Sequence, residues 1–144
     1  MDLQNRWQIS NENSLLKRFK VDHLNRTQHL LKQLIAFPTI SADSNLQMIE
    51  FLADYLDHLG ADVLLNHSSD ETKANMFATL GHGHKNGVLL SGHTDVVPVA
   101  DQHWSHDPFD MVERNGRLHG RGTCDMKGFI AACLTKAHDY AKLP

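Results

Sequence analysis

The chain has 144 residues, of which 41% are hydrophobic and 22% are charged. Its 14 Lys and Arg residues stand against 17 Asp and Glu residues, so the formal net charge at pH 7 is −3. These values are ordinary for a globular domain, and they exclude a collagenous chain, a disordered chain and a strongly basic nucleic-acid-binding chain. We therefore expect one domain or part of one, with no nucleic acid among its partners.

Neither export nor membrane insertion is expected from the sequence. No apolar run approaches the roughly 20 residues that a membrane-spanning helix needs, and the first residues lack the apolar block of a signal peptide. Cys124 and Cys133 are too few for a disulfide framework, and their spacing matches no zinc-ribbon or redox motif. We expect a cytoplasmic protein without a membrane partner.

The chain begins with a polar stretch, residues 1–22, that shows little hydrophobic periodicity. We expect it to be a loosely attached extension of a domain that spans residues 23–144. A first helix is expected from Leu24 to about Ala36, because Pro38 would force the residue before it out of the α region. One face of this helix is apolar at helical spacing, and it carries Leu30, Leu31, Leu34 and Ile35.

A second helix is indicated by both of its ends. Ser44 followed by Gln47 fits a capping box, in which two side chains bond the backbone at the start of a helix. Gly60 stands where a glycine in the left-handed conformation commonly ends a helix. The residues between them form an apolar stripe, which consists of Met48, Ile49, Leu52, Leu56 and Leu59.

The hydrophobic period then shortens to that of strands. Short apolar runs at residues 63–65, 75–80 and 88–91 are separated by polar turns. The last run, in the sequence GVLL, shows no alternation, which suits a strand covered on both faces. A third helix is expected from Met126 towards Lys142. This order of elements predicts the α/β fold class, with too few elements to complete a sheet that is covered on both sides.

The first candidate site follows the run GVLL directly. In open α/β sheets ligands bind beyond the carboxyl ends of the strands, so polar residues are well placed there. In an extended chain His93 and Asp95 point to the same side, and a carboxylate beside an imidazole fixes its tautomer and raises its basicity. The composition gives about one His-x-Asp sequence by chance. A turn-capping Asp95 beside a partly exposed His93 is therefore the alternative.

The second candidate site lies in the sequence GRGTCDMKG at residues 120–128. Its three glycines allow a close approach of the backbone. Asp125 falls where the third helix should begin. It is either the N-cap of that helix or a carboxylate held at a turn so that both of its oxygens reach metal ions. The spacing leaves both interpretations open.

Other histidines and cysteines are weaker candidates. The His-Gly-His sequence at residues 82–84 lies in a glycine-rich loop and is expected to be solvated. His103 and His106 flank Trp104 and could bind a metal ion, but the neighbouring aromatic residues favour packing. Cys124 has no evident partner and is expected to be a small buried packing residue.

Taken together, GHTDVVP and GRGTCDMKG, with W-x-x-DPF between them, resemble the di-zinc amidohydrolase and peptidase family. This family includes acetylornithine deacetylases, succinyl-diaminopimelate desuccinylases, carboxypeptidases and aminoacylases. The resemblance runs from about Leu30 to the end of the chain, and residues 116–131 are most similar to acetylornithine deacetylases. It implies a zinc-exopeptidase-like catalytic domain with a mostly parallel or mixed sheet flanked by helices.

The resemblance also implies roles for three residues. His93 corresponds to a ligand of one zinc ion, and Asp125 corresponds to the carboxylate that bridges both ions. Asp95 corresponds to the aspartate that orients the imidazole and supports the catalytic base. The implied cofactors are two divalent metal ions, with zinc as the first choice and cobalt as the alternative. In this family the peptide bond after the bridging aspartate is cis.

The implied activity is hydrolysis of the amide bond of an N-acyl amino acid, a small-molecule substrate. Deacetylation of N-acetylornithine to ornithine and acetate, a step of arginine biosynthesis, is the first expectation. A desuccinylase, dipeptidase or aminoacylase of the same family is one alternative, and a non-catalytic remnant is another.

The resemblance covers only the first part of the family's catalytic domain. The family's general-base glutamate and its remaining metal ligands come after the position that matches Pro144, and the dimerisation domain of its homodimeric members is absent. Zinc sites normally take three or four protein ligands, and a general base contributes roughly 10²–10⁴-fold to the rate. We therefore expect a domain that is incomplete at the C-terminus, nearly inactive alone and poorly soluble.

Overall fold

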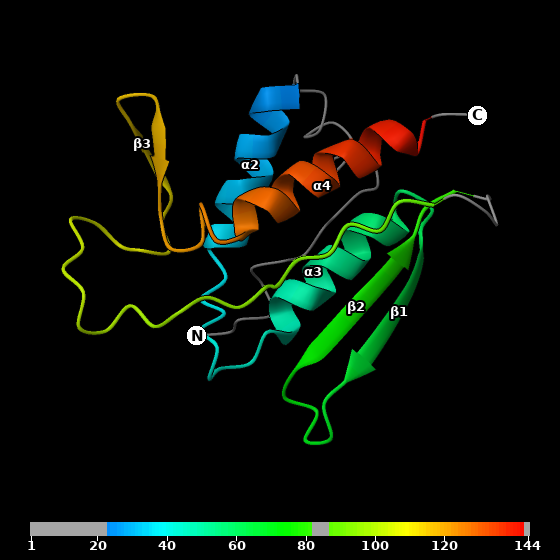
Figure 1. Ribbon diagram of the computed structural model, residues 1–144, viewed down its shortest axis with the longest axis horizontal. Helices are drawn as coiled ribbons and strands as arrows, with labels where there is room; N and C mark the ends of the chain where they lie inside the picture. The colour runs from blue at the N-terminus through cyan, green and yellow to red at the C-terminus, as the bar shows by residue number, and fades with distance from the viewer. Residues whose placement is uncertain (1–22, 82–86, 143–144) are drawn as a thin grey trace, which may run out of the picture.

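The computed structural model describes residues 23–81 and 87–142 of the chain. They form a mixed α/β structure with three helices and two small sheets (Figure 1). The α/β class is therefore confirmed, whereas the predictions for residues 1–22 and 82–84 lie outside the described residues. In chain order the elements are α2 (His23–Ile35), α3 (Leu46–Asp57), β1 (Asp62–His67), β2 (Ala74–Thr79), β3 (Val112–Arg114), β4 (Arg117–His119) and α4 (Lys127–Tyr140).

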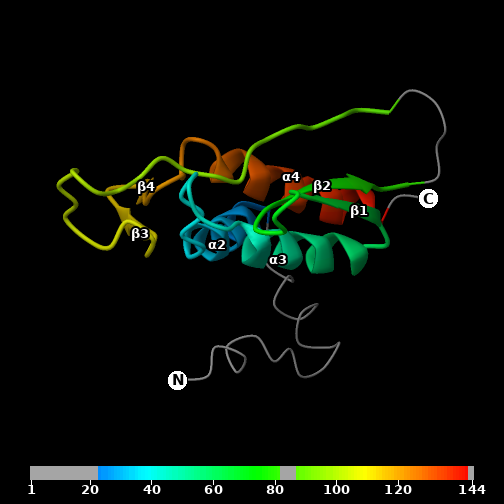
Figure 2. The ribbon, with the colours of Figure 1, turned by 90° about the horizontal axis from the view of Figure 1, so that it is seen from below.

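Helix α2 confirms the first predicted helix. It ends at Ile35, two residues before Phe37, the residue that precedes Pro38. The four apolar residues predicted to share a face are each exposed by 5% or less. This face packs against α4, whose Ala131 and Leu134 belong to the same core (Figures 1 and 2). The core of the structure therefore joins elements from opposite ends of the described chain.

Helix α3 begins differently from the prediction. Its N-cap is Asn45 rather than Ser44, whose hydroxyl accepts a hydrogen bond from the backbone of Leu46 at 3.3 Å. The capping box with Gln47 is therefore wrong. The physical reason is tertiary, since the Asn45 amide exchanges two hydrogen bonds of 2.9 Å with the backbone of Ala74. The start of the helix is tied to β2 instead of to its own first turn.

The C-terminal end of α3 follows the prediction. Gly60 has φ +81°, in the left-handed region that glycine tolerates best. The backbone N–H of Ala61 then reaches back to the carbonyl of Leu56 at 3.1 Å. The predicted apolar stripe is buried at Met48, Ile49 and Leu52 and partly buried at Leu56 and Leu59. Tyr55, which the sequence pattern did not indicate, is buried as well.

Strands β1 and β2 form an antiparallel hairpin that α3 covers on one face (Figure 2). Leu65 pairs with Met76, and both side chains pack against the core. Leu64 pairs with Phe77 on the other face, where they are exposed by 66% and 55%. Among the described residues, this second face is left uncovered.

The prediction of a strand at residues 88–91 is wrong for the described part of the chain. The segment is extended without ladder partners there, and Val88, Leu89 and Leu90 are exposed by 86%, 73% and 54%. Figure 2 shows it running outside the β1–β2 hairpin. An unalternating apolar run becomes a buried strand only when neighbouring strands pair with it, and none of the described strands does so.

The mostly parallel or mixed sheet is likewise not confirmed. Both sheets of the described residues have two antiparallel strands. Their parallel pairing is limited to one isolated bridge between Ile40 and Val96. That single bridge nevertheless matters, because it connects the turn after α2 with the first candidate site.

Strands β3 and β4 lie within the stretch between the two candidate sites. Asn115 and Gly116 turn between them with φ of 54° and 70°, the two positive values that a tight hairpin turn of this type requires. The hairpin lies at the opposite end of the molecule from β1 and β2 (Figure 1). It therefore does not extend the first sheet.

Helix α4 confirms the third predicted helix. It begins at Lys127, one residue after the expected start, and its buried face includes Ala131, Leu134 and His138. Among the helices of the described residues, none combines the length and the apolar character that crossing a bilayer requires.

Candidate metal centre

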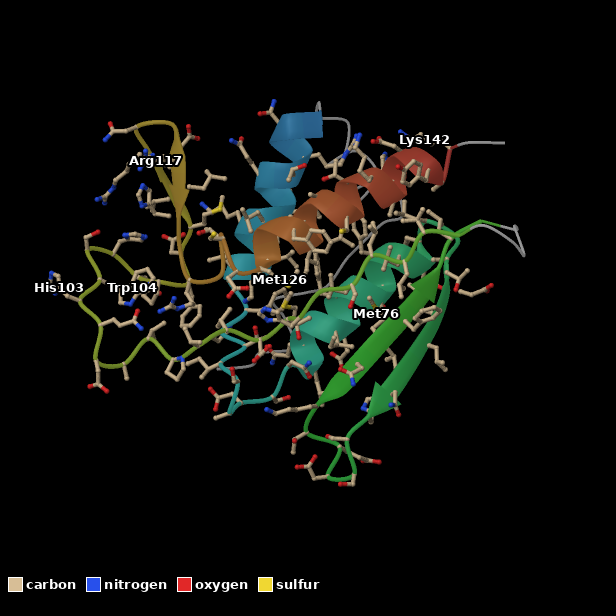
Figure 3. All side chains as sticks on the ribbon, in the orientation of Figure 1. Met76, His103, Trp104, Arg117, Met126 and Lys142 are labelled. Atoms are coloured by element: carbon tan, nitrogen blue, oxygen red, sulfur yellow. The ribbon has the colours of Figure 1, made fainter. Side chains whose placement is uncertain are left out.

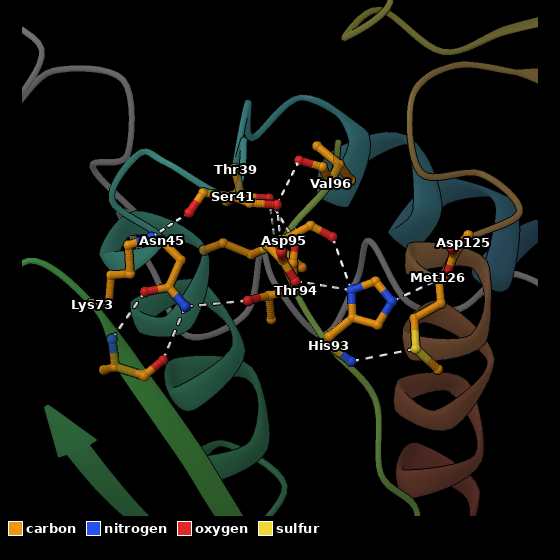
Figure 4. A network of polar contacts seen from close by, with 12 residues as sticks. Thr39, Ser41, Asn45, Lys73, His93, Thr94, Asp95, Val96, Asp125 and Met126 are labelled. Carbon is orange, nitrogen blue, oxygen red and sulfur yellow. Dashed lines mark hydrogen bonds and ion pairs between the residues drawn. The ribbon is translucent and has the colours of Figure 1, made fainter. Parts of the chain in front are cut away.

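The segment 93–96, which carries the first candidate residues, is held by the turn that follows α2 (Figure 4). The backbone N–H of Val96 donates to the carbonyl of Thr39 at 2.8 Å, and the N–H of Ser41 donates to the carbonyl of Val96 at 3.0 Å. The hydroxyl of Thr39 also donates to the carbonyl of Thr94 at 2.6 Å. The segment is therefore extended and fixed in register.

His93 and Asp95 lie on one side of this segment, as alternation predicts. His93 Nδ1 is 3.0 Å from Asp95 Oδ1. Thr94 points away from them, and its hydroxyl meets the amide of Asn45 at 3.2 Å. The hydroxyl of Ser41 donates to Asp95 Oδ2 at 2.6 Å. Each oxygen of the Asp95 carboxylate therefore has its own partner, which fixes the orientation of the group.

Asp125 approaches the same imidazole from the start of α4. The N-cap of that helix is Met126, so the interpretation of Asp125 as the N-cap is wrong. Asp125 Oδ1 lies 3.0 Å from His93 Nε2 (Figure 4). The peptide bond between Asp125 and Met126 is cis, as the resemblance implies. Cys124, expected to be buried, is exposed in the turn that presents Asp125.

The imidazole of His93 is placed between two carboxylates, and this placement changes its proton affinity. Partial burial of the ring lowers the pKa of His93, but hydrogen bonds with Asp125 and Asp95 outweigh it and leave the pKa above its ordinary value. The hydrogen bond from Ser41 holds the pKa of Asp95 below its usual range. The His93 and Asp125 side chains are exposed by 48% and 84%, so the pair is open to solvent.

The donor set of this pair fits a zinc-like cation. An imidazole whose Nδ1 bonds a carboxylate directs its Nε2 lone pair towards a metal ion. Zinc–nitrogen and zinc–oxygen bonds are about 2.0–2.2 Å long. The 3.0 Å between His93 Nε2 and Asp125 Oδ1 is shorter than the sum of two such bonds, so one ion can contact both atoms.

The pair supplies two of the three or four protein ligands that zinc normally takes. Within residues 23–81 and 87–142, no group of three or more His, Cys, Asp or Glu side chains could hold a metal ion. The structure therefore brings the predicted ligands together, and a full coordination shell would require further donors.

The histidines of the long loop lie elsewhere. His103 and Trp104 lie on the long loop, to one side of Met126, the residue that follows Asp125 (Figure 3). His106 meets the edge of the Trp104 ring with 6.3 Å between ring centroids, and the guanidinium of Arg121 lies 5.1 Å from the centre of that ring. Packing around Trp104 is therefore what these contacts show.

Two residues of the site were missed by the sequence analysis. Ser41 follows the end of α2 in a short polar turn, and this turn is the signal that could have indicated it. Lys127 is fully buried, and burial lowers its pKa to about 8. It precedes Ala131 and Leu134 by four and seven residues, so helical spacing places it on the buried face of α4.

Comparison with known proteins confirms the resemblance that the two motifs predict. Residues 89–144 match the model of peptidase family M20/M25/M40. The chain is 43% identical over 117 residues to an acetylornithine deacetylase of Shigella sonnei (strain Ss046), which covers 76% of this chain and 30% of that relative. The same identity and coverage are found with an acetylornithine deacetylase of Proteus mirabilis (strain HI4320).

The chain thus spans about 30% of the length of the curated relatives it matches. The matched family region contains His93, Asp95 and Asp125. Their individual roles as metal ligands and as the orienting aspartate stay predictions.

Proposed function

We propose that this chain, whose residues 89–144 match peptidase family M20/M25/M40, is part of a metal-dependent amidohydrolase that cleaves an N-acyl amino acid. The observation that carries the proposal is the convergence of His93 and Asp125, with Asp95 behind the imidazole. The favoured substrate is N-acetylornithine, because both relatives above are named acetylornithine deacetylase. The products would be ornithine and acetate, as a step of arginine biosynthesis.

Each residue of the site has a distinct task in this proposal. Asp95 keeps the proton on Nδ1 of His93, so Nε2 is the atom that binds. Ser41 holds the second oxygen of Asp95 and prevents the carboxylate from turning away. Asp125 offers a solvent-exposed carboxylate that is able to bridge two cations. Two divalent ions, zinc or alternatively cobalt, would supply a water of lowered pKa and polarise the amide carbonyl.

We expect the 144-residue chain alone to show no detectable turnover. The described residues offer a pair of ligands where a zinc site needs three or four, and this observation also favours a second candidate, a non-catalytic chain that retains the fold. A desuccinylase, dipeptidase or aminoacylase of the same family is the alternative among enzymes. Cation binding and turnover are therefore tested separately.

Cation binding is tested by equilibrium dialysis of the 144-residue chain against Co²⁺ and Zn²⁺. We expect His93→Gln and Asp125→Asn each to weaken binding at least about tenfold, because each removes a ligand. His103→Gln is the matched control, since His103 is an exposed histidine on the long loop, away from Met126 in Figure 3. Equal binding by the unaltered chain and by both site variants would contradict the assignment of the ligands.

Turnover is tested on the polypeptide that the gene encodes around these 144 codons, established by reading the coding frame on both sides. We expect it to release acetate from N-acetylornithine in a metal-dependent way, and faster than it cleaves N-succinyl-diaminopimelate or dipeptides. Cleavage of none of these substrates, and of no other N-acyl amino acid, would leave the non-catalytic candidate. Metal-dependent hydrolysis by the 144-residue chain itself would contradict the expected lack of turnover.

A further inference from the structure

Lys127 is a fully buried lysine whose amine bonds the end of another helix. Its Nζ donates to the carbonyl of Leu34 at 3.0 Å and to the carbonyl of Phe37 at 2.7 Å. The carbonyl of Leu34 lies in the last turn of α2, and that of Phe37 lies two residues after the helix, where the helix dipole favours a cation. Lys127 therefore joins the first residue of α4 to the last turn of α2.

The turn that follows this end of α2 also holds the segment 93–96, which carries His93. Phe37 is followed by the turn in which Thr39 and Ser41 bond the backbone of Val96. Ser41 also holds the carboxylate of Asp95 at 2.6 Å. The carbonyl of Phe37, which accepts a hydrogen bond from Lys127, is thus two residues before Thr39, the first residue that holds the segment 93–96.

The carbon chain of Lys127 also lies where the turn before Asp125 packs against the segment 93–96. A Cβ atom placed on Gly122 would lie 3.1 Å from Lys127 Cδ and 3.0 Å from Val96 Cγ1. The backbone N–H of Lys127 donates to the carbonyl of Gly122 at 2.9 Å. Lys127 therefore contacts the turn that presents Asp125 from within, only two residues after Asp125 itself.

We propose that Lys127 is a positioning residue for the metal centre, which sets the separation of His93 and Asp125 by tying the start of α4 to the turn that holds the segment 93–96. This inference rests on the proposed function only in its assumption that the pair binds a cation. The tie itself consists of the two hydrogen bonds from Nζ and the packed carbon chain of Lys127.

We expect the chain to fold without the amine of Lys127. The carbonyl of Leu34 also accepts the N–H of Phe37 at 3.3 Å, and the carbonyl of Phe37 also accepts the N–H of Thr39 at 2.9 Å. Neither carbonyl is left without a partner when the amine is removed. Replacing buried ion pairs by apolar residues of similar volume is often neutral or stabilising, because burying a charge costs desolvation free energy, and the same cost applies to the ammonium group of Lys127. A methionine at position 127 should therefore preserve the fold and lose only the tie.

The test compares the unaltered chain with Lys127→Met and with Lys136→Met, a control that removes an exposed lysine from the same helix. Each protein is titrated with Co²⁺ and followed by its visible absorption spectrum, while circular dichroism and thermal melting report the fold. We expect Lys127→Met to melt no lower than the unaltered chain, to bind Co²⁺ about 10–100-fold more weakly and to change the spectrum. Lys136→Met should match the unaltered chain.

Equal Co²⁺ affinity and spectrum in Lys127→Met would overturn the positioning role and leave the proposed function intact. If the unaltered chain binds no Co²⁺, the pair does not form a cation site in this chain alone, and crystal structures of the metal-free proteins decide the inference. Separation of His93 Nε2 from Asp125 Oδ1 beyond 3.0 Å in Lys127→Met alone would then support it, and an unchanged distance would overturn it.

A second variant covers the case in which Lys127→Met does not fold. Lys127→Gln keeps one hydrogen-bond donor near the carbonyl of Phe37, and it is compared by the same Co²⁺ titration. Weaker binding by a folded Lys127→Gln chain supports the inference. Failure of both variants to fold would make Lys127 a residue of general stability and overturn it.

Discussion

His93 Nε2 and Asp125 Oδ1 lie 3.0 Å apart although 32 residues separate them in the chain. The first residue stands on a segment held by the turn after α2, and the second precedes α4. The distance between the two side chains therefore depends on how α2 and α4 pack against each other. This arrangement also gives the imidazole two carboxylate neighbours, which makes its protonation measurable.

The first prediction concerns the titration of His93 in the metal-free protein. Its pKa should lie above the ordinary value of 6.5, because the hydrogen bonds that the ring donates to Asp125 and Asp95 outweigh the effect of burial. Since the folded-state pKa is raised, this group stabilises the fold below the unfolded-state pKa, and the contribution is lost as pH rises through the folded-state value. The chemical shifts of the ring in NMR spectra measure the titration.

Asp125→Asn is the variant that checks this assignment. It removes one negative neighbour and should lower the pKa of His93. Ser41→Ala should raise the pKa of Asp95, because the hydroxyl of Ser41 is the largest influence that lowers it. An unchanged His93 titration in Asp125→Asn would show that the two side chains do not meet in solution.

The second prediction concerns the stability of the chain at alkaline pH. Burial lowers the pKa of Lys127 from 10.5 to about 8, so the folded state loses its proton before the unfolded state does. Between these two values the unfolded chain binds more protons, and the free energy of unfolding should rise with pH. The shift corresponds to a rise on the order of 3 kcal/mol. Urea unfolding at pH 7.5 and pH 10.5 measures it.

Lys127→Met should lose this rise, while Lys136→Met should keep it. The relevant quantity is the difference between each variant and the unaltered chain, because other groups titrate in the same range. A rise of equal size in Lys127→Met and in the unaltered chain would mean that the buried lysine is not its source.

Local patterns were sufficient for the elements whose cause is local. The spacing of Leu30 and Leu34 identifies the buried face of α2, and Gly60 identifies the end of α3. The apolar run around Leu89 was misjudged, because a run becomes a strand only when another strand pairs with it. The N-cap of α3 was misjudged for a similar reason, since Asn45 bonds a distant strand.

The site divides in the same way. Alternation along an extended chain placed His93 beside Asp95, and the structure has them 3.0 Å apart. Nothing local connects that pair with Asp125, and only the family resemblance brought the two motifs together. Lys127 was overlooked because lysine is almost never fully buried, so its residue type argued against its position in the helical pattern.

The third prediction concerns Gly128 at the start of α4. A Cβ atom there would lie 2.4 Å from the backbone carbonyl oxygen of Thr123, a distance that forces the turn before Asp125 to move. Gly→Ala in an ordinary helix stabilises it by about 1 kcal/mol. Here we expect the opposite sign, with Gly128→Ala lowering the free energy of unfolding by about 2 kcal/mol or more.

Gly87→Ala is the matched control, because a Cβ atom on Gly87 would meet nothing within 4 Å. Urea unfolding of both variants measures their free energies of unfolding. We expect a loss of stability in Gly128→Ala and none in Gly87→Ala. A Gly128→Ala chain as stable as the unaltered one would mean that the turn accommodates the methyl group freely. Weaker Co²⁺ binding in Gly128→Ala would further indicate that the turn presents Asp125.

The last prediction concerns the exposed apolar segment at residues 88–90. Val88 and Leu89 are exposed by 86% and 73%, and the extended backbone beside them has no ladder partner among the described residues. Apolar side chains on an unpaired extended segment favour association between chains. Leu89→Lys adds a charge to a side chain that is mostly exposed, so it should raise the soluble concentration and change the free energy of unfolding by no more than about 0.5 kcal/mol.

Leu34→Lys supplies the contrast, because Leu34 is fully buried and the same substitution there should unfold the chain. Light scattering and the protein concentration that survives centrifugation measure association, and circular dichroism measures the fold. A Leu89→Lys chain that unfolds would show that this side chain is buried in solution. A folded variant that associates as strongly as the unaltered chain would place the cause of association elsewhere, on the uncovered face of β1 and β2 that carries Leu64 and Phe77.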